Sequence, residues 1–421
     1  MKEEIRSFSL IKDEPAFMQA IRLGAAENIE TLDFPVIERV NYQNWNLFQN
    51  NLEEEESFAG VPDFTEIETD SAIIVQMNGQ TVFTQVPQTL LEAGVVVEDL
   101  FEAMTSHPEL LEKYYLKKAV LADEDKMTAH HASFMNSGIL VYVPENVHLT
   151  EPISAVFRQN SDSDEAFNKH VLIVGGANSS FSYLEKFDSY GENTKQSSAN
   201  IMVEVILETG SQLKYAAIDH LGEKVTTFMN RRGWIGKDAH VDWNIATMND
   251  GNIVYDLDSD LIGDGSQAIM KVVAISYKDQ IQGIDTRVTN IGNHSVGHIL
   301  QHGVILDRAA LTFNGIGHIL KGAKGADAQQ ESRVLMLSDL ARGDANPILL
   351  IDENEVTAGH AASIGRVDPD EMYYLMSRGI DEVVARKLVI RGFLGNVITA
   401  IPSRSVQEEF INMIEGKLAN V

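Results

Sequence analysis

Three histidines recur at a spacing that metal ligands sometimes have. His294, His298 and His302 are four residues apart, so on a helix they would share one face and their imidazole nitrogens could bind zinc. Three glycines interrupt this stretch, and the flanking sequence is typical of strands. On a strand the first two histidines would lie about 13 Å apart at about 3.3 Å per residue, too far for two ligands of one ion. The pattern therefore favours surface or ladder histidines over a metal site.

A triplet of alternating acids resembles the start of a calcium loop. Asp256, Asp258 and Asp260 have the spacing, but the sharp-turn position falls on Leu261 instead of glycine, and the closing acid falls on Gln267. These departures exclude an EF-hand loop. We interpret the acids as solvated residues of a turn.

The catalytic and nucleotide-binding groups that the chain lacks exclude several reactions. There is no Gly-x-x-x-x-Gly-Lys-Ser/Thr loop, and no lysine is followed by serine or threonine, so a P-loop is ruled out. There is no Gly-x-Ser-x-Gly motif of the hydrolase type. The absence of cysteine removes disulfides, thiolate nucleophiles and thiolate metal ligands.

Composition is typical of a globular protein with an acidic surface. Of 421 residues, 44% are hydrophobic and 23% charged, and 33 basic against 62 acidic residues give a net charge of −29. This charge repels nucleic acid and anionic lipid, so we expect neither as a partner. The charged start Met1-Lys-Glu-Glu-Ile-Arg leads into no apolar stretch of signal length, and no window approaches a membrane span. We therefore expect a cytoplasmic protein.

The chain divides by texture into three regions. Residues 1–125 are mostly helical: a helical period runs from Glu4 to Leu23 with a break at Asp13-Glu-Pro15, and 90–104 and 108–121 are two further helices. Residues 126–355 consist of short β-branched runs separated by Gly, Asn and Asp, with no crossover helix. Residues 356–421 become helical again.

A weak repeat within the strand-rich region predicts a coil. Gly210-Ser-Gln-Leu213, Asp238-Ala-His-Val241, Gly265-Ser-Gln-Ala268 and Asn293-His-Ser-Val296 share a turn residue, two polar or small residues and an apolar one. The apolar members are 28, 27 and 28 positions apart. Stacked strands with one continuous core would explain this period. We predict a mainly β protein with a parallel β-helix core flanked by N-terminal and C-terminal helical regions; a β-sandwich is the competing fold.

The C-terminal region carries clear helix signals. Asp368-Pro-Asp-Glu supplies an N-cap acid, a proline at the first position and acids in the first turn, and Gly379 is a C-cap glycine. A second helix begins at Asp381, and a third extends from residue 405 to 418. Three amphipathic helices therefore close the chain.

Several ordered blocks resemble the SufB/SufD family of iron–sulfur cluster assembly. They are Asn136-Ser-Gly-Ile-Leu-Val-Tyr-Val-Pro144, Asp327-Ala-Gln-Gln330, Leu335-Met-Leu-Ser-Asp339, Ala341-Arg-Gly-Asp-Ala-Asn-Pro347, Gly359-His-Ala-Ala-Ser-Ile-Gly365 and Tyr373-Tyr-Leu-Met-Ser-Arg-Gly-Ile380. The resemblance covers at least residues 130–402. The short chain, the helical N-terminal region and the absent cysteines favour the SufD branch over the SufB branch.

The resemblance implies a fold and a role. The fold would be a right-handed parallel β-helix between two helical regions. The chain would be a non-catalytic scaffold of a SufB–SufC–SufD complex, pairing with a SufB-type scaffold through the coil. Its C-terminal helices would dock a SufC-type ATPase, and the residues that we expect in this contact are Tyr373, Tyr374, Leu375, Arg378, Gly379 and Ile380.

His360 matches a family histidine thought to lie at the SufB–SufD interface, where a cluster is built. The family segment is usually Cys-Ser-His-Gly-Ala-Thr, and here it is Ala358-Gly-His-Ala-Ala-Ser363. His360 is therefore a candidate cluster ligand, while any thiolate must come from the partner, because Ala358 replaces the cysteine. We expect no cofactor bound stably by this chain alone, and a transient iron–sulfur cluster at the partner interface.

Two alternatives to this role remain. A β-helix carbohydrate-processing enzyme would need clustered acids on one face, and a SufB-like scaffold would associate with itself. Whether the isolated chain is a homodimer stays open.

Overall fold

A computed structural model of the protein describes residues 1–52, 71–399 and 404–418. Its strands form two long sheets. The nine-stranded sheet contains, in spatial order, β18 (Arg342–Ile351), β16 (Ala310–Ile319), β14 (Ile281–Asn290), β12 (Ile253–Leu261), β10 (Val225–Ile235), β8 (Ser197–Leu207), β6 (Phe167–Gly175), β4 (Ser137–Val143) and β3 (Val96–Asp99). The ten-stranded sheet contains β19 (Thr357–Arg366), β17 (Asp327–Met336), β15 (Val296–Ile305), β13 (Gln267–Ser276), β11 (His240–Thr247), β9 (Gln212–His220), β7 (Ser180–Tyr190), β5 (Ile153–Asn160), β1 (Ile73–Met77) and β2 (Gln80–Gln85).

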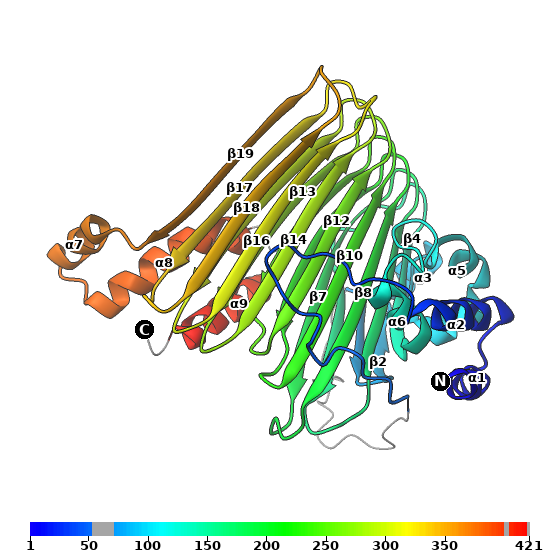
Figure 1. The fold of residues 1–421 in the computed structure, drawn as a ribbon. Coiled ribbons are helices and arrows are strands. Elements are labelled where there is room, and N and C mark those ends of the chain that lie inside the picture. Colours follow the sequence, from blue (N-terminus) through cyan, green and yellow to red (C-terminus); the bar gives the residue numbers. More distant parts are fainter. Residues whose placement is uncertain (53–70, 400–403, 419–421) are drawn as a thin grey trace.

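From β4 onward, successive strands alternate between the two sheets, and each strand up to β17 pairs in parallel with the strand two positions further along the chain. One turn of the chain therefore adds one strand to each sheet, and the turns stack as a coil (Figure 1). This arrangement confirms the predicted parallel β-helix and excludes the β-sandwich. The core follows from it, because inward side chains of both sheets meet along the whole coil.

The repeat read from the sequence marks one corner of the coil. Gly210, Asp238, Gly265 and His294 adopt positive φ angles of 71°, 52°, 70° and 53°. Each donates its backbone N–H to a carbonyl of the next turn, so the corners stack as the strands do. The fourth predicted repeat is shifted by one residue, because the turn residue is His294 instead of Asn293 and Ala268 pairs with Gly297.

A charged network lies inside the coil. Arg231 on β10 is fully buried and bonds Asp219 through both terminal nitrogens, at 2.8 and 2.7 Å, and Glu185 at 2.8 Å. The Tyr215 hydroxyl accepts from Nε of Arg231 at 3.0 Å and donates to Glu185. Because every member has a partner in a low-dielectric interior, the network fixes the relative positions of β7, β9 and β10.

Helices precede the coil and cover its nine-stranded sheet. They are α1 (Lys2–Ile11), α2 (Ala16–Asn28), α3 (Gln88–Glu92), α4 (Leu100–Ser106), α5 (Pro108–Tyr114) and α6 (Lys126–Phe134). The predicted break at Pro15 is confirmed. The predicted helix over 90–104 is wrong, because Gly94 turns the chain at φ 79° and β3 then pairs antiparallel with β4. Helix α5 is also shorter than predicted, since Leu116 has φ 51°.

An extended segment joins these helices to the coil. Residues 33–48, which we call the strap, cross the outer face of the nine-stranded sheet as the dark blue trace in Figure 1. Val40, Tyr42 and Trp45 belong to a cluster with Phe228 of β10 and Val254 of β12. The strap is therefore packed on the middle turns of the coil.

Three helices follow the last strand. They are α7 (Pro369–Ser377), α8 (Glu382–Ile398) and α9 (Arg404–Lys417), and Asp368 caps α7 by accepting from the Asp370 amide, as predicted. Helices α8 and α9 pack through Ile390, Leu394, Phe410 and Ile414 on the outer face of the ten-stranded sheet. The boundaries 1–125, 126–355 and 356–421 stay a prediction; β1 to β3 and β19, which lie outside 126–355, pair with strands of the coil. In the described part of the chain no helix is long and apolar enough to cross a membrane.

His130 on α6 makes the packing of the N-terminal helices sensitive to acid. Its ring lies between Phe48 and Phe134, at 5.1 and 5.0 Å between ring centres, and burial lowers its pKa to about 4. Between pH 6.5 and 4 the unfolded chain binds a proton at this site that the folded chain does not. The free energy of unfolding therefore decreases as the pH is lowered through this range. We expect this histidine to account for a loss of about 3 kcal/mol over that range.

The measurement is urea unfolding of the wild type and of His130→Phe between pH 7 and pH 4.5. The difference in unfolding free energy between the two proteins should change with pH, with the variant losing less. Parallel pH profiles would contradict the assignment.

Candidate functional site: the open end of the coil

The two ends of the coil differ. At the first end, β1 pairs antiparallel with β2 and β3 pairs antiparallel with β4, so a reversed strand ends the parallel ladder of each sheet. At the other end, β18 and β19 each have a neighbour on one side only within the described residues. Edge backbone groups of this kind are available to pair with another chain.

The last turn also exposes side chains that earlier turns bury. Val334, Ser332 and Gln330 of β17 are buried in the coil, and their partners on β19 in the register are Ile364, Ala362 and His360. These three inward positions of β19 are exposed. The interior of the coil is therefore laid open at this end.

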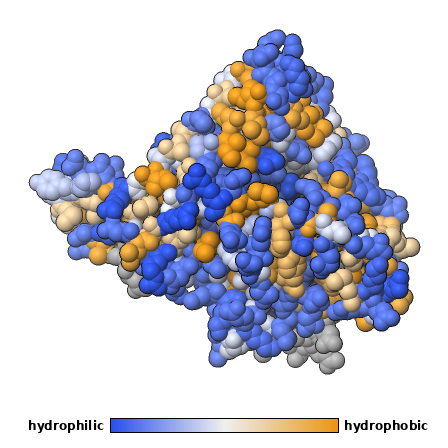
Figure 2. All heavy atoms as spheres, viewed as in Figure 1, coloured by the Kyte–Doolittle hydropathy of each residue, from blue (hydrophilic) through white to orange (hydrophobic). Residues whose placement is uncertain are grey.

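Apolar residues dominate the exposed end. Leu350 and Ile351 at the end of β18 are each 45% exposed, and Ile364 is 44% exposed. Figure 2 shows apolar atoms gathered near the upper tip of the coil, over the region where β18 ends. Such a patch on an unpaired edge is typical of a protein-interaction surface.

His360 lies in the middle of this end. It pairs in the register with Gln330, whose Nε2 donates to the Ile348 carbonyl at 2.9 Å and whose buried Oε1 has no partner among the described residues. A side chain at Gly359 would approach the Oε1 of Gln329 to 2.6 Å, so glycine allows the close fit of β19 on β17. The imidazole is thus placed on the inward column and open to a partner.

The predicted ATPase-docking residues lie on and just after α7. This helix follows β19 after two residues and projects away from the coil (Figure 1). Tyr373 is 74% and Tyr374 58% exposed, Leu375 and Ile380 are half-buried, and the Arg378 guanidinium lies 5.3 Å from the centre of the Tyr374 ring. Gly379 ends the helix with φ 88°. A groove of about 470 Å³ lies between this helix, α8 and the end of β17.

The structure separates His360 from the other histidines considered in the sequence. His298 and His302 lie on β15, where His298 is 3.1 Å from Asp327 and His302 is 3.3 Å from Glu331, each on the adjacent strand. The second ring nitrogen of His302 is 2.9 Å from the Phe393 carbonyl of α8, and the two rings stack. These histidines form ladders, as predicted, and His302 positions α8.

The interpretation of the acid triplet as a solvated turn is wrong. Asp256, Asp258 and Asp260 lie on β12, and the first two are buried at 5% and 8% exposure. Burial raises the pKa of Asp258 to about 8 and, on the neighbouring strand, that of Asp285 to about 7. The alternation of acids with Tyr255 and Leu257 in a strand-rich stretch was the signal that could have identified a strand.

Comparison with known proteins agrees with this architecture. The model for the SufBD core domain of SUF system iron–sulfur cluster assembly matches residues 157–393, and that for the SufBD N-terminal region matches 6–155. The iron–sulfur cluster assembly protein SufD of Bacillus subtilis is 42% identical over 99% of this chain and 98% of its own length. A SufBD family protein of iron–sulfur cluster assembly from Staphylococcus haemolyticus is 23% identical over 94% of this chain and 89% of its own.

These names describe assembly proteins and give no support to a carbohydrate-processing enzyme. Together with the coil and its open end, the matches show that the chain belongs to the SufBD family of the SUF iron–sulfur cluster assembly system.

Proposed function

We propose that the chain is a non-catalytic scaffold subunit of a cytoplasmic SufB–SufC–SufD complex. It pairs with a SufB-type scaffold through the open end of the coil and docks a SufC-type ATPase through its C-terminal helices. The observation that carries the proposal is the last turn, where β18 and β19 offer unpaired edges and the exposed apolar residues Leu350, Ile351 and Ile364. The match to SufD of Bacillus subtilis supports the SUF system as the setting.

Pairing at this end follows from the physics of the coil. A partner strand in register would satisfy the outer N–H and C=O groups of the edge strands and cover the exposed inward residues. A second coil with the same open end offers such strands, and a SufB-type scaffold is the partner that the family resemblance implies. Whether two copies of this chain also pair in isolation stays an open prediction.

Ile364→Lys tests the pairing. The lysine would place a charge on the exposed inward side of β19, beside Val334 and the edge backbone, and we expect at least a 10-fold loss of affinity for a SufB-type partner, measured by calorimetry. The matched control is Ile281→Lys on β14 in the middle of the coil, where the isoleucine is 37% exposed. Equal losses in both variants, or no loss in either, would contradict pairing through this end.

Docking of the ATPase rests on the exposure of α7. Among the described residues none of this helix is buried, although it carries two tyrosines and two methionines. The helix continues directly from β19, so its displacement by an ATPase would act on the strand that carries His360. This connection offers a route from nucleotide-driven motion to the open end of the coil.

The double substitution Tyr373→Ala and Tyr374→Ala tests the docking. Exposed aromatic anchors typically contribute 1 to 3 kcal/mol each at an interface, so we expect at least a 10-fold weaker interaction with a SufC-type ATPase. Retention of the ATPase in co-purification measures it, and Leu91→Ala on α3, at 50% exposure, is the control. Point changes are preferable to truncation, because removing α8 and α9 would expose the apolar outer face of the ten-stranded sheet. Full retention would exclude α7 as the docking element.

His360 is proposed as one ligand of a nascent cluster at the partner interface. The cluster is cargo of the complex. In this proposal the chain by itself binds no cofactor stably. With Ala358 in place of the family cysteine, the remaining ligands come from the partner. An exposed imidazole on the inward column is suited to meet them.

His360→Ala should leave the complex assembled but lower its bound iron and sulfide several-fold. The measurement is the iron and sulfide content of the complex purified without oxygen, compared with His240→Ala on β11. If both variants carry as much cluster as the wild type, His360 has no ligand role.

A further inference from the structure

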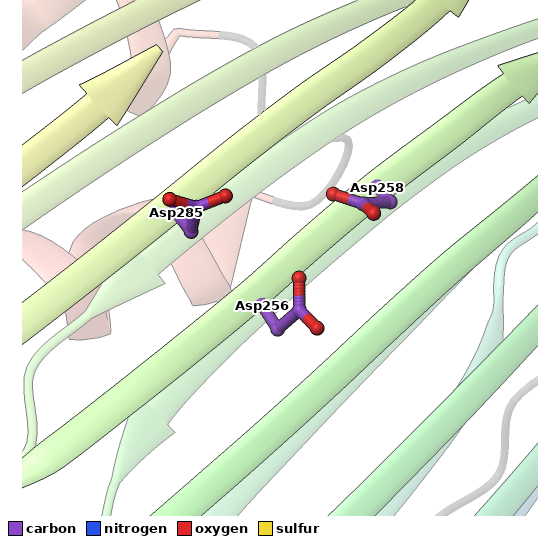
Figure 3. Close-up of side chains that lie close together, drawn as sticks. All are labelled: Asp256, Asp258 and Asp285. Atoms are coloured by element: carbon purple, nitrogen blue, oxygen red, sulfur yellow. The ribbon is translucent and has the colours of Figure 1, made fainter. Parts of the chain in front are cut away.

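Three buried carboxylates meet on the outer face of the nine-stranded sheet. Asp256 and Asp258 project from β12 and Asp285 from β14, and one oxygen of each lies within 4.8 Å of the others. Figure 3 shows the three side chains grouped around a common space between the two strands. The register of β12 on β14 brings the three carboxylates together. Asp256 pairs with Asp285, and Asp258 lies two residues further along the same face of β12.

An arginine holds two of these side chains from one side. Arg232 on β10 bonds Oδ2 of Asp256 at 2.8 Å and Oδ2 of Asp258 at 2.7 Å. Arg232 does not bond the Oδ1 atoms of these two aspartates, which could therefore contact an ion. The arrangement fixes the orientation of two carboxylates in the manner of an outer-shell partner around a metal.

Two buried oxygens of the group have no donor. Oδ1 of Asp258 and Oδ1 of Asp285 make no hydrogen bond within the described residues, and Asp285 is only 4% exposed. A buried carboxylate oxygen without a donor costs several kcal/mol, so such an atom points to a missing ligand. Nε of Arg287, which pairs with Asp258 in the register, is likewise unpartnered there.

The local charge leaves room for a cation. Five carboxylates lie in or beside the group, and two guanidinium groups face them. The carboxylates belong to Asp256, Asp258, Asp285, Asp125 and Glu124, and the guanidinium groups to Arg232 and Arg287. With all five carboxylates ionised, the surplus would be three negative charges in a mostly buried place. A dication would offset most of it.

The strap covers neighbouring positions of the same sheet, on β10, β14 and β16. Val40 packs against Gly283, where an added Cβ would meet it at 2.7 Å, and Tyr42 stacks on Phe228 at 6.3 Å. Asn314 on β16 donates to the Glu38 carbonyl at 3.1 Å. The carboxylates therefore lie beside a lid formed by the chain itself, with little bulk water.

We propose that Asp256, Asp258 and Asp285 bind a hard divalent cation of about the size of calcium. The donor set is oxygen only, which suits Ca²⁺ and Mn²⁺ and disfavours soft metals. Oxygens that lie within 4.8 Å of one another can contact one ion, and Ca²⁺ tolerates an irregular set of oxygen ligands, whereas Mg²⁺ demands near-ideal octahedral geometry. The bound ion would tie β12 to β14 beneath the strap. This site is separate from His360 and holds no cluster.

The test uses the whole chain, first freed of metal with a chelator. We expect Ca²⁺ to raise the thermal midpoint by about 2 °C or more in a saturable way, and Mg²⁺ to do so less. Mn²⁺ should give an altered electron paramagnetic resonance signal at about one ion per chain, which Ca²⁺ displaces.

Asp285→Asn removes one metal-binding carboxylate. It also removes a buried acidic group whose Oδ1 has no hydrogen-bond partner among the described residues, so the metal-free variant should fold with unchanged or higher stability. Its affinity for Ca²⁺ should fall at least 10-fold. Asp260→Asn, on the same strand and face but outside the group, should bind within about 2-fold of the wild type. Two results would overturn the proposal: no saturable response of the wild type to Ca²⁺ or Mn²⁺, or equal responses in Asp285→Asn and the wild type.

Discussion

The parallel hydrogen-bond ladder is the constraint on which the rest of the structure depends. Each turn satisfies the backbone groups of the turn before it and presents its own to the next. The first turn is closed by the antiparallel strands β2 and β3, whereas the last turn, β18 and β19, is left open in the described chain. The proposed interaction surface is therefore a direct consequence of how the coil is built and ended.

The same register arranges side chains into columns. Residues 26 to 32 positions apart become neighbours at about 4.8 Å, so inward columns fill the core and outward columns form polar ladders. Asp256 and Asp285 are two such neighbours, and His302 contacts Glu331 diagonally, next to its register partner Arg333. His302 also anchors α8 through the Phe393 carbonyl, and the aspartate pair contributes to the proposed cation site.

Much of this could be predicted from local sequence. The turn residues Gly210, Asp238 and Gly265 fix the period because positive φ angles restrict residue choice, and Asp368 and Gly379 mark α7 through capping. The fourth repeat was misplaced because one turn of the coil spans 29 residues, from Gly265 to His294. Residues 90–104 were assigned to one helix because the antiparallel pairing of β3 with β4 is not local.

The site was harder to predict for the same reason. The family motif located His360, but its exposure arises because no further turn follows β19 in the described chain, which no local pattern reveals. The buried state of Asp256 and Asp258 depends on Arg232 and on the strap, which lie far away in the sequence. Composition and spacing identify residue types, whereas burial is decided by long-range register.

Hydrogen exchange of the chain with and without a SufB-type partner tests the central claim most directly. The account predicts that the partner protects the outer amides of β18 and β19, leaving the amides of the middle turns at their already slow rates. Unchanged exchange at these two strands in a complex that has demonstrably formed would contradict pairing through the open end of the coil.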